Sequence, residues 1–240
     1  MKLSKNASLL LAGMMALGLL ISGGLASCGR GPNDLEIKSK VVKLISEHGS
    51  CTGEQVRAPS GTDYILSAGH CMILVKDGSV TVIKEDGTML QRRVLAEDPN
   101  SDLMLIEGLP SVEGLPIADE VSRAEHLRSF THGGGMPTYK TEGEVIGFEV
   151  IQAPTSAIAS QEQEALCASM PKNIVFSTPT GMTCILSVKE LATTVPIIPG
   201  SSGGPVVNDN GELAGVVSAG GGTLGFMVTL DDIHEFIAGY

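Results

Sequence analysis

Three short segments of the sequence contain the kinds of side chain that nucleophilic catalysis needs. Residues 199–205 form a Gly- and Ser-rich run, residues 66–71 include His70, and residues 96–106 place acids directly before an apolar run. A serine hydroxyl is an effective nucleophile when an imidazole with a pKa near neutrality lies close enough to take its proton. A carboxylate can hold that imidazole in one tautomer. These residue types therefore predict acyl transfer.

The run Pro199–Pro205 reads P-G-S-S-G-G-P and resembles the nucleophile loop G-x-S-G-G-P of the chymotrypsin-like serine peptidases. By this resemblance Ser202 is the nucleophile, and the backbone N–H groups of Gly200 and Ser202 form the oxyanion hole. Glycine at position 200 permits the turn that points its N–H inward, and Gly203 and Gly204 keep side chains away from the substrate. Without further motifs, such a run would indicate only a loop.

The segment Leu66–Cys71 reads L-S-A-G-H-C and resembles the T-A-A-H-C segment that carries the general base in the same family. His70 is therefore the expected base. The remaining histidines lie outside this motif, and we expect each to be a surface or loop residue: His48, His126, His132 and His234.

The segment Ala96–Ile106 resembles the family motif D-x-x-x-D-[LI]-A-L-[LI], and Asp102 occupies the position of the acid that orients the histidine. Asp98 is the rival carboxylate, but it precedes a proline and is typical of a turn, so we favour Asp102. The order His, Asp, Ser along the chain is that of chymotrypsin-like peptidases and differs from the orders in subtilisin and the α/β-hydrolases.

The resemblance extends to segments that would bind substrate. Gly211–Gly220 is similar to the family's strand that ends in S-W-G and pairs with the substrate backbone. The match implies that Ser218 supports Asp102, and that Ala219 and Gly220 form one wall of the primary specificity pocket. Alanine here replaces the usual tryptophan.

Gly225–Val228 resembles the return strand, which implies that Gly225 lies in the other pocket wall. Pro196, six residues before the nucleophile, matches the approximate base of the pocket, where a trypsin has an acid. An Arg or Lys side chain would find no counter-charge there. Ser201 stands where digestive peptidases have an aspartate that captures a freed N-terminal ammonium, so we expect that activation route to be absent.

The first residues have the pattern of an export signal, because Lys2 and Lys5 precede an apolar run at residues 9–21 that has no acid. The sequence Leu25–Cys28 resembles the lipobox of bacterial lipoproteins, which implies cleavage before Cys28 and modification of that cysteine by diacylglyceryl and palmitate chains. An uncleaved anchor or an ordinary signal peptide is the alternative. We expect an exported protein of the bacterial cell envelope, lipid-anchored on the periplasmic or extracellular face.

The chain has five cysteines, an odd number for an exported protein. With Cys28 carrying lipid, the other four can form two disulfides in an oxidising compartment. The family resemblance implies the pair Cys51–Cys71, which leaves Cys167 with Cys184. No CxxC or HExxH spacing occurs, so no metal site is expected.

Removal of residues 1–27 leaves 240 − 27 = 213 residues and takes away two lysines and no acid, which changes the net charge from −11 to −13. So acidic a chain has little attraction for phosphate backbones, and nucleic acid is not an expected partner. The remaining length suits one large or two small β-domains.

Short apolar segments broken by turn residues predict an all-β fold. They lie at residues 64–67, 80–84, 89–95, 103–106, 144–151, 174–177, 184–188, 206–208 and 212–218. Glu85-Asp86-Gly87 and Asp209-Asn210-Gly211 are typical of tight hairpins. Acids at the start of residues 230–237, followed by apolar residues at helical spacing, predict a C-terminal helix.

With the family resemblance, the expected architecture is two six-stranded antiparallel β-barrels of chymotrypsin-like type and a C-terminal helix. The expected boundaries are a signal peptide at 1–27, a flexible tether at 28–36, an N-terminal barrel with the His and Asp at 37–120, and a C-terminal barrel with the Ser at 121–240. The crossover between barrels is expected within residues 116–128.

The expected activity is that of a serine endopeptidase that needs no cofactor and acts on a protein or peptide substrate. Its other expected partner is the membrane, through the lipid anchor. Two alternatives stay open: a surface lipoprotein that uses the barrels as a binding module and has no activity, and an esterase, since the same chemistry opens esters.

Overall fold

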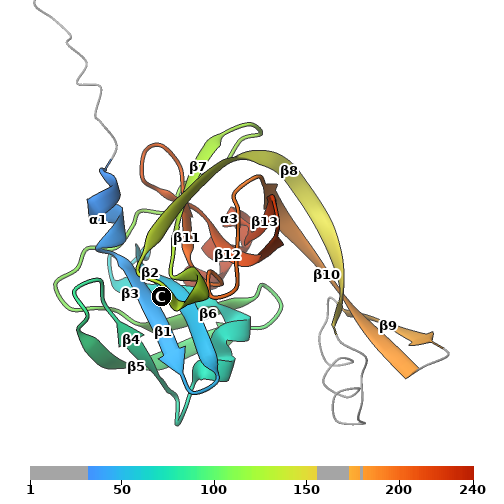
Figure 1. Ribbon diagram of the computed structural model, residues 1–240, viewed down its shortest axis with the longest axis horizontal. Helices are drawn as coiled ribbons and strands as arrows, with labels where there is room; N and C mark the ends of the chain where they lie inside the picture. Colours follow the sequence, from blue (N-terminus) through green and yellow to red (C-terminus); the bar gives the residue numbers. More distant parts are fainter. Residues whose placement is uncertain (1–31, 156–172, 179–180) are drawn as a thin grey trace, which may run out of the picture. The chain divides into compact units, whose positions relative to one another are not determined.

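The computed structural model describes residues 32–155, 173–178 and 181–240. Helical structure in these ranges is short and consists of α1 (Asp34–Lys38), α3 (Leu230–Ile237) and the 3-10 turns η1 (Gly69–Leu74) and η2 (Gly133–Gly135). The rest of the regular structure is β-strand, arranged in two closed antiparallel barrels (Figure 1).

The first barrel consists of β1 (Val41–Ser46), β2 (Gly49–Arg57), β3 (Asp63–Ala68), β4 (Ser79–Ile83), β5 (Met89–Asp98) and β6 (Leu103–Glu107). Its strand order is β1-β2-β3-β6-β5-β4, and the barrel closes where Leu44 of β1 pairs with Val82 of β4. In β4, buried Val80 and Val82 alternate with partly exposed residues. This period of two is the pattern of a strand with one face in the core.

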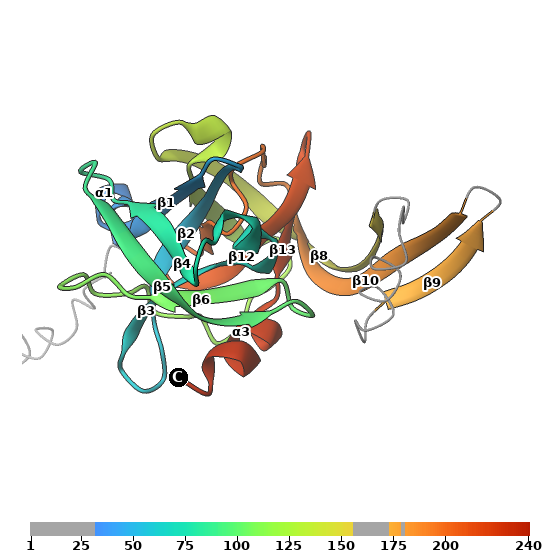
Figure 2. The same cartoon turned by 90° about the horizontal axis from the view of Figure 1, so that it is seen from below.

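The second barrel consists of β7 (His126–Thr131), β8 (Tyr139–Thr155), β10 (Gly181–Thr193), β11 (Pro205–Val207), β12 (Leu213–Gly221) and β13 (Leu224–Val228). The order is β13-β12-β11-β7-β8-β10, and pairing of β10 with β13 closes the barrel. A further strand, β9 (Asn173–Thr178), pairs with β10 outside this ring (Figure 2).

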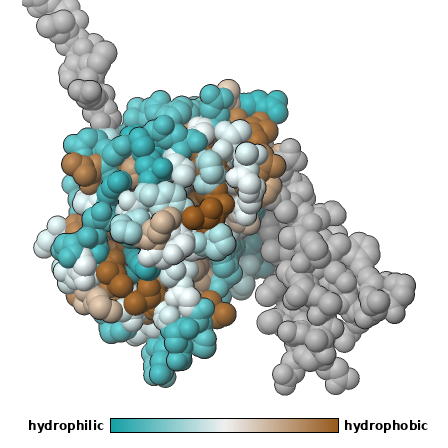
Figure 3. Space-filling view, in the orientation of Figure 1, coloured by the Kyte–Doolittle hydropathy of each residue, from teal (hydrophilic) through white to brown (hydrophobic). Residues whose placement is uncertain are grey.

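The two barrels share an apolar contact. Leu66 and Leu105 of the first barrel pack in one cluster with Leu213 and Val216 of the second barrel. Helix α3 contributes its buried face, Leu230, Ile233 and Ile237, to the same cluster. The spacing of three and four residues puts these side chains on one side of the helix. On the face of the molecule drawn in Figure 3, the surface hydrophobic residues lie in separate patches among hydrophilic ones.

The predicted fold class is confirmed, with two six-stranded antiparallel barrels and a C-terminal helix. Most predicted strands correspond to β3–β6 and β8–β12, and Gly87 and Gly211 lie at positive φ in the two predicted hairpins. The sequence pattern does not single out β1, β2 or β7, because polar residues such as Glu54 and Gln55 interrupt their apolar runs. The segment between the barrels starts earlier than predicted, after β6, and β7 already begins at His126.

The chain is folded slightly before the predicted end of the tether. Residues 34–36 belong to α1, and Asn33 caps this helix by accepting a hydrogen bond from the Glu36 N–H. Asp34 forms ion pairs with Arg128 and with Lys140, each at 2.9 Å. These contacts hold α1 on strands β7 and β8 of the second barrel.

The disulfide Cys51–Cys71 is present as predicted, with a sequence separation of 20. Closure of a loop of this length contributes about 3 kcal/mol to stability in the chain-entropy model. The predicted signal peptide, the lipidation site Cys28 and the pair partner Cys167 lie outside the described residues. Across the three described ranges, no helix is long and apolar enough to span a bilayer.

Candidate active site

His70 is placed by the end of strand β3 and the first residues of η1. Gly69 begins η1 and donates its N–H to the carbonyl of Asp102 at 2.8 Å. A Cβ at position 69 would come within 3.0 Å of the backbone of Asp102 and Leu103. Glycine therefore lets the segment before His70 run directly against the segment that carries Asp102.

Asp102 lies in the turn between β5 and β6 and has a φ of +55°, a left-handed conformation that Asp adopts more readily than most residues. The rival carboxylate, Asp98, accepts hydrogen bonds from the Asn100 N–H at 2.9 Å and the Ser101 hydroxyl at 2.5 Å. Asp98 thus shapes the turn, and it is Asp102 that the structure pairs with His70.

The carboxylate of Asp102 is bound from both sides. Its Oδ1 accepts the backbone N–H of His70 at 2.7 Å, and its Oδ2 lies 2.9 Å from Nδ1 of the His70 ring. Ser218 of β12 donates its hydroxyl to the same Oδ2 at 3.0 Å. With Nδ1 facing a carboxylate, the neutral ring carries its proton there, and Nε2 is left as the proton acceptor.

Opposing effects act on the pKa of His70. Partial burial favours the neutral ring and lowers the pKa, while the hydrogen bond to Asp102 and the charges of Asp102 and Glu190 raise it. The pKa is raised from its ordinary value of 6.5 as the net result. The ring is still accessible to a substrate, because 49% of the side chain is exposed.

Ser202 lies in a loop that both barrels fix. Its carbonyl accepts the N–H of Thr52 from β2 at 2.8 Å, and the next residue, Gly203, donates to the carbonyl of Val217 at 2.7 Å. Gly203 has a φ of +78°, and a Cβ there would lie 2.1 Å from the Ser67 hydroxyl. Over the described ranges, no hydrogen bond joins Ser202 to His70, a bond that in free enzymes is often long.

The peptide between Pro199 and Gly200 is oriented by η2. The carbonyl of Pro199 accepts the N–H of Gly134 at 2.7 Å, and Gly200 itself has a φ of +91°. In a trans peptide the C=O and N–H point in opposite directions, so the N–H of Gly200 points away from Gly134. Neither this N–H nor that of Ser202 donates to any group in the described part of the chain.

Ser201 is fully buried, in contrast to its neighbour Ser202. Its hydroxyl lies 3.0 Å from the Thr131 hydroxyl and 3.1 Å from the Tyr139 hydroxyl. Gly133 covers this cluster so closely that a Cβ there would lie 2.3 Å from the Tyr139 oxygen. Neutral hydroxyl groups thus hold the position where digestive peptidases have an aspartate.

The pocket prediction needs one correction. Pro196, predicted at the pocket base, is exposed, and it is the buried Ile197 that faces the two glycines. A Cβ on Gly220 would lie 2.6 Å from Ile197, and one on Gly225 would lie 2.9 Å from it. Gly220 and Gly225 are register partners on β12 and β13, and Ala219 beside them is exposed. Adjacent side chains point in different directions, so it is Ile197 and not Pro196 that packs against the two glycines.

The sequence patterns do not identify two buried polar residues. His132 lies in a loop, which agrees with its expected place, but it is only 5% exposed, and its ring lies 3.0 Å from the Met136 carbonyl and 3.2 Å from the Thr138 hydroxyl. Glu190 of β10 is 6% exposed and lies beside Ser218. The adjacent Lys189 makes this pair typical of a surface turn, so the sequence signal for a buried acid is weak.

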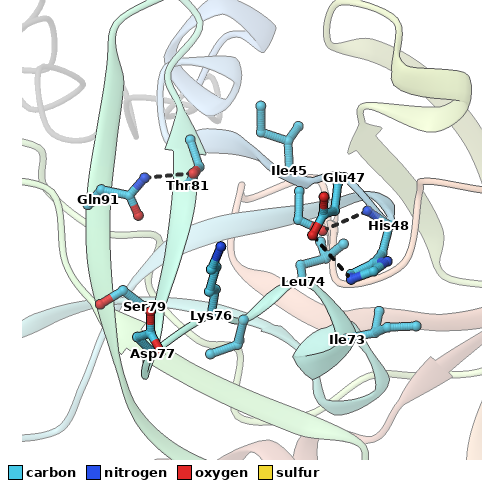
Figure 4. Close-up of a pocket in the computed structure, with 12 residues that line it drawn as sticks. Ile45, Glu47, His48, Ile73, Leu74, Lys76, Asp77, Ser79, Thr81 and Gln91 are labelled. Carbon is cyan, nitrogen blue, oxygen red and sulfur yellow. Dashed lines mark hydrogen bonds and ion pairs between the residues drawn. The ribbon is translucent and has the colours of Figure 1, made fainter.

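A cavity of about 640 Å³ opens beside η1 (Figure 4). Its lining includes Glu47 and His48 from the β1–β2 turn, Ile73 and Leu74 from η1, and Lys76. None of His70, Asp102 and Ser202 lines it, so the cavity is separate from the candidate triad. The described residues contain no cluster of three or more His, Cys, Asp or Glu side chains that could hold a metal ion.

Known proteins resemble this chain in sequence and in fold. The serine protease Do-like HtrA of Bacillus subtilis (strain 168) is 24% identical over 176 residues, which are 72% of this chain and 34% of that protein. The chain therefore spans about a third of that relative. An inactive form of Rv3671c from M. tuberculosis H37Rv matches with a TM-score of 0.61 at 19% identity, over 85% of this chain and 88% of that one.

A serine endoprotease from Yersinia pestis matches with a TM-score of 0.57 at 16% identity, over 85% of this chain and 64% of that one. These structural matches show a shared fold. The family model described as trypsin-like peptidase domain matches residues 51–216, which is more than half of the chain. The chain therefore belongs to the trypsin-like peptidase family.

Proposed function

We propose that this protein is a serine endopeptidase that cleaves peptide bonds through an acyl-enzyme formed on Ser202. The observation that carries the proposal is the arrangement at Asp102, whose carboxylate binds Nδ1 of His70 and the hydroxyl of Ser218 at once. This leaves the exposed Nε2 of His70 as a base, on the side where a substrate can approach.

The proposed reaction has two halves. Ser202 Oγ attacks the peptide carbonyl carbon and transfers its proton to His70 Nε2, and the N–H groups of Gly200 and Ser202 bind the oxyanion. His70 then gives the proton to the leaving nitrogen, and the C–N bond breaks. In the second half, water attacks the ester, loses its proton to His70, and the proton returns to Ser202 Oγ. No cofactor enters these steps.

The backbone N–H groups separate this proposal from the binding-module alternative. The Gly200 and Ser202 donors make no internal hydrogen bond, and the Pro199 carbonyl is held away from the hole by Gly134. Because neither donor is used inside the described part of the chain, both are available to bind the oxyanion of a substrate. The esterase alternative uses the same groups and differs in substrate.

The hydroxyl cluster around Ser201 supports activity without proteolytic activation. Hydrogen bonds between Ser201 and the hydroxyls of Thr131 and Tyr139 hold this residue and leave no requirement for a new N-terminal ammonium. We further propose export and lipid anchoring at Cys28, on the basis of the signal-like residues 1–27 and the lipobox-like sequence, with residues 28–33 joining the anchor to α1. The membrane and a protein or peptide substrate are the proposed partners.

The first test concerns the nucleophile. Ser202→Ala should abolish labelling by a fluorophosphonate probe and lower kcat by about 10⁶-fold, as loss of the serine does in a comparable site. His70→Ala should be about as damaging. Ser201→Ala is the matched control and should keep probe labelling, although it loses hydrogen bonds worth roughly 1 kcal/mol each. Labelling that survives Ser202→Ala would refute Ser202 as the nucleophile, whereas an unmutated protein that never reacts with the probe would favour the binding-module alternative.

The second test concerns the support of the oxyanion loop. In Gly133→Ala, the added methyl group would clash with the hydroxyl oxygens of Tyr139 and Ser201. The free energy of unfolding should therefore fall by about 1–3 kcal/mol, the usual cost of overpacking. The rate of peptide hydrolysis should fall as well, because Ser201 is adjacent to Gly200, one of the two proposed oxyanion donors. Gly239→Ala, with open space around its Cβ, should change neither quantity. Equal melting curves for Gly133→Ala and Gly239→Ala would contradict the conclusion that close packing at Gly133 supports the loop of Ser201.

The third test concerns specificity. Ile197 packs against both Gly220 and Gly225, where its side chain would restrict the proposed pocket, so a peptide library should show cleavage after small or aliphatic residues and poor cleavage after Arg or Lys. Ile197→Ala should shift the preference toward larger apolar residues. A profile dominated by basic residues would overturn the pocket assignment.

The fourth test concerns the anchor. If Cys28 receives the lipid, Cys28→Ser should leave an unprocessed precursor and remove labelling by radioactive palmitate. A correctly cleaved soluble protein from this variant would refute the lipid anchor and leave the peptidase proposal intact.

A further inference from the structure

Glu190 is a buried acid next to the candidate triad that the proposed reaction does not use. It is 6% exposed, and its Oε2 has no hydrogen-bond partner within the described ranges. A buried carboxyl without full hydrogen bonding lowers stability, so its presence beside an active site calls for a role there.

Strand pairing places Glu190 in the same wall of the second barrel as the strand that carries Ser218. Glu190 of β10 is the register partner of Val228 on β13, and Val228 is the register partner of Val216 on β12. The β12–β13 ladder is irregular between Val217 and Ala219, where Ser218 stands. Ser218 donates its hydroxyl to Asp102 and also interacts with the carboxyl group of Glu190.

Ser218 has one hydroxyl proton and two carboxyl neighbours. When the proton is donated to Asp102, a protonated Glu190 can donate to the Ser218 oxygen, whereas an ionised Glu190 competes with Asp102 for the same proton. The charge of Glu190 also acts on His70, because a carboxylate nearby favours the imidazolium. We propose that Glu190 is a positioning residue of the triad, acting through Ser218 on Asp102 and coupling its own protonation to that of His70.

The charges that surround Glu190 agree with this assignment. Burial raises the pKa of Glu190, the charge of Asp102 raises it further, and the Ser218 hydrogen bond and His70 lower it. On its own strand, Lys189 is exposed and pairs with Asp231 at 3.4 Å. Strands β12 and β13 carry no titratable side chain, and on β8 the register partner is Glu149.

The test is a pair of measurements on Glu190→Gln, a substitution that keeps the shape and a donor for Ser218 but removes the charge. The NMR titration of the His70 ring in the free protein should move to lower pH, because the imidazolium loses a stabilising carboxylate. The acid limb of the kcat/KM profile should move in the same direction. The fall in kcat should be several-fold, far less than the ~10⁴-fold loss caused by neutralising the orienting aspartate in a comparable triad.

A matched variant completes the design. Glu54→Gln removes a fully buried carboxyl on β2 whose oxygens have no hydrogen-bond partner in the described part of the chain, and it should leave the His70 titration unchanged. An unchanged His70 titration in Glu190→Gln, or an equal shift in Glu54→Gln, would overturn the proposal.

This inference rests on the proposed function, but the two can fail separately. If Glu190→Gln shifts the His70 titration while the unmutated protein hydrolyses nothing, the coupling stands and the peptidase proposal fails. If hydrolysis is found and the titration does not move, Glu190 has no part in the triad.

Discussion

The contacts of Asp102 are the constraint on which the site depends. This carboxylate takes hydrogen bonds from His70 in the first barrel and from Ser218 in the second, so it joins the two barrels at the proposed catalytic base. Its left-handed backbone is costly for a residue other than glycine, and the turn bonds of Asp98 help to hold it. The apolar cluster that the two barrels share holds them together and so helps to keep the His70–Asp102–Ser218 arrangement in place.

Thr52 makes the corresponding link at the nucleophile loop. From β2 its N–H binds the Ser202 carbonyl, and its hydroxyl donates to the Gly200 carbonyl at 2.9 Å while accepting the N–H of His132. Thr52 of the first barrel therefore holds the nucleophile loop of the second barrel at Gly200 and at Ser202, the residues before and after Ser201. The neighbouring disulfide at Cys51 limits the freedom of that strand and also ties it to η1, which contains His70.

Much of the fold could be predicted from the sequence, because the motifs around His70, Asp102 and Ser202 are short contiguous segments. Each segment can be recognised without knowing which residues it contacts in the fold. The pocket residue could not be predicted in the same way. Whether Pro196 or Ile197 faces Gly220 depends on the path of the backbone, and a shift of one residue reverses the side-chain direction. Glu190 shows the other limit: a Lys-Glu pair is typical of a surface, and the burial of the second member follows from the pairing of β10 with β13, which are far apart in sequence.

The neutral cluster around Ser201 has a different physical basis from the ion pair that holds this loop in digestive peptidases. A buried ion pair gains its strength only after two charges lose their hydration, and it forms when a new N-terminus becomes available. Hydroxyl hydrogen bonds contribute about 1 kcal/mol each and are present as soon as the chain folds. Together with the glycine at position 133, which leaves no room for a side chain, they keep the loop in one conformation. Control of such an enzyme then has to act on access to the site or on the triad itself, and an acid such as Glu190, buried beside Asp102, is a means of acting on the triad through protonation.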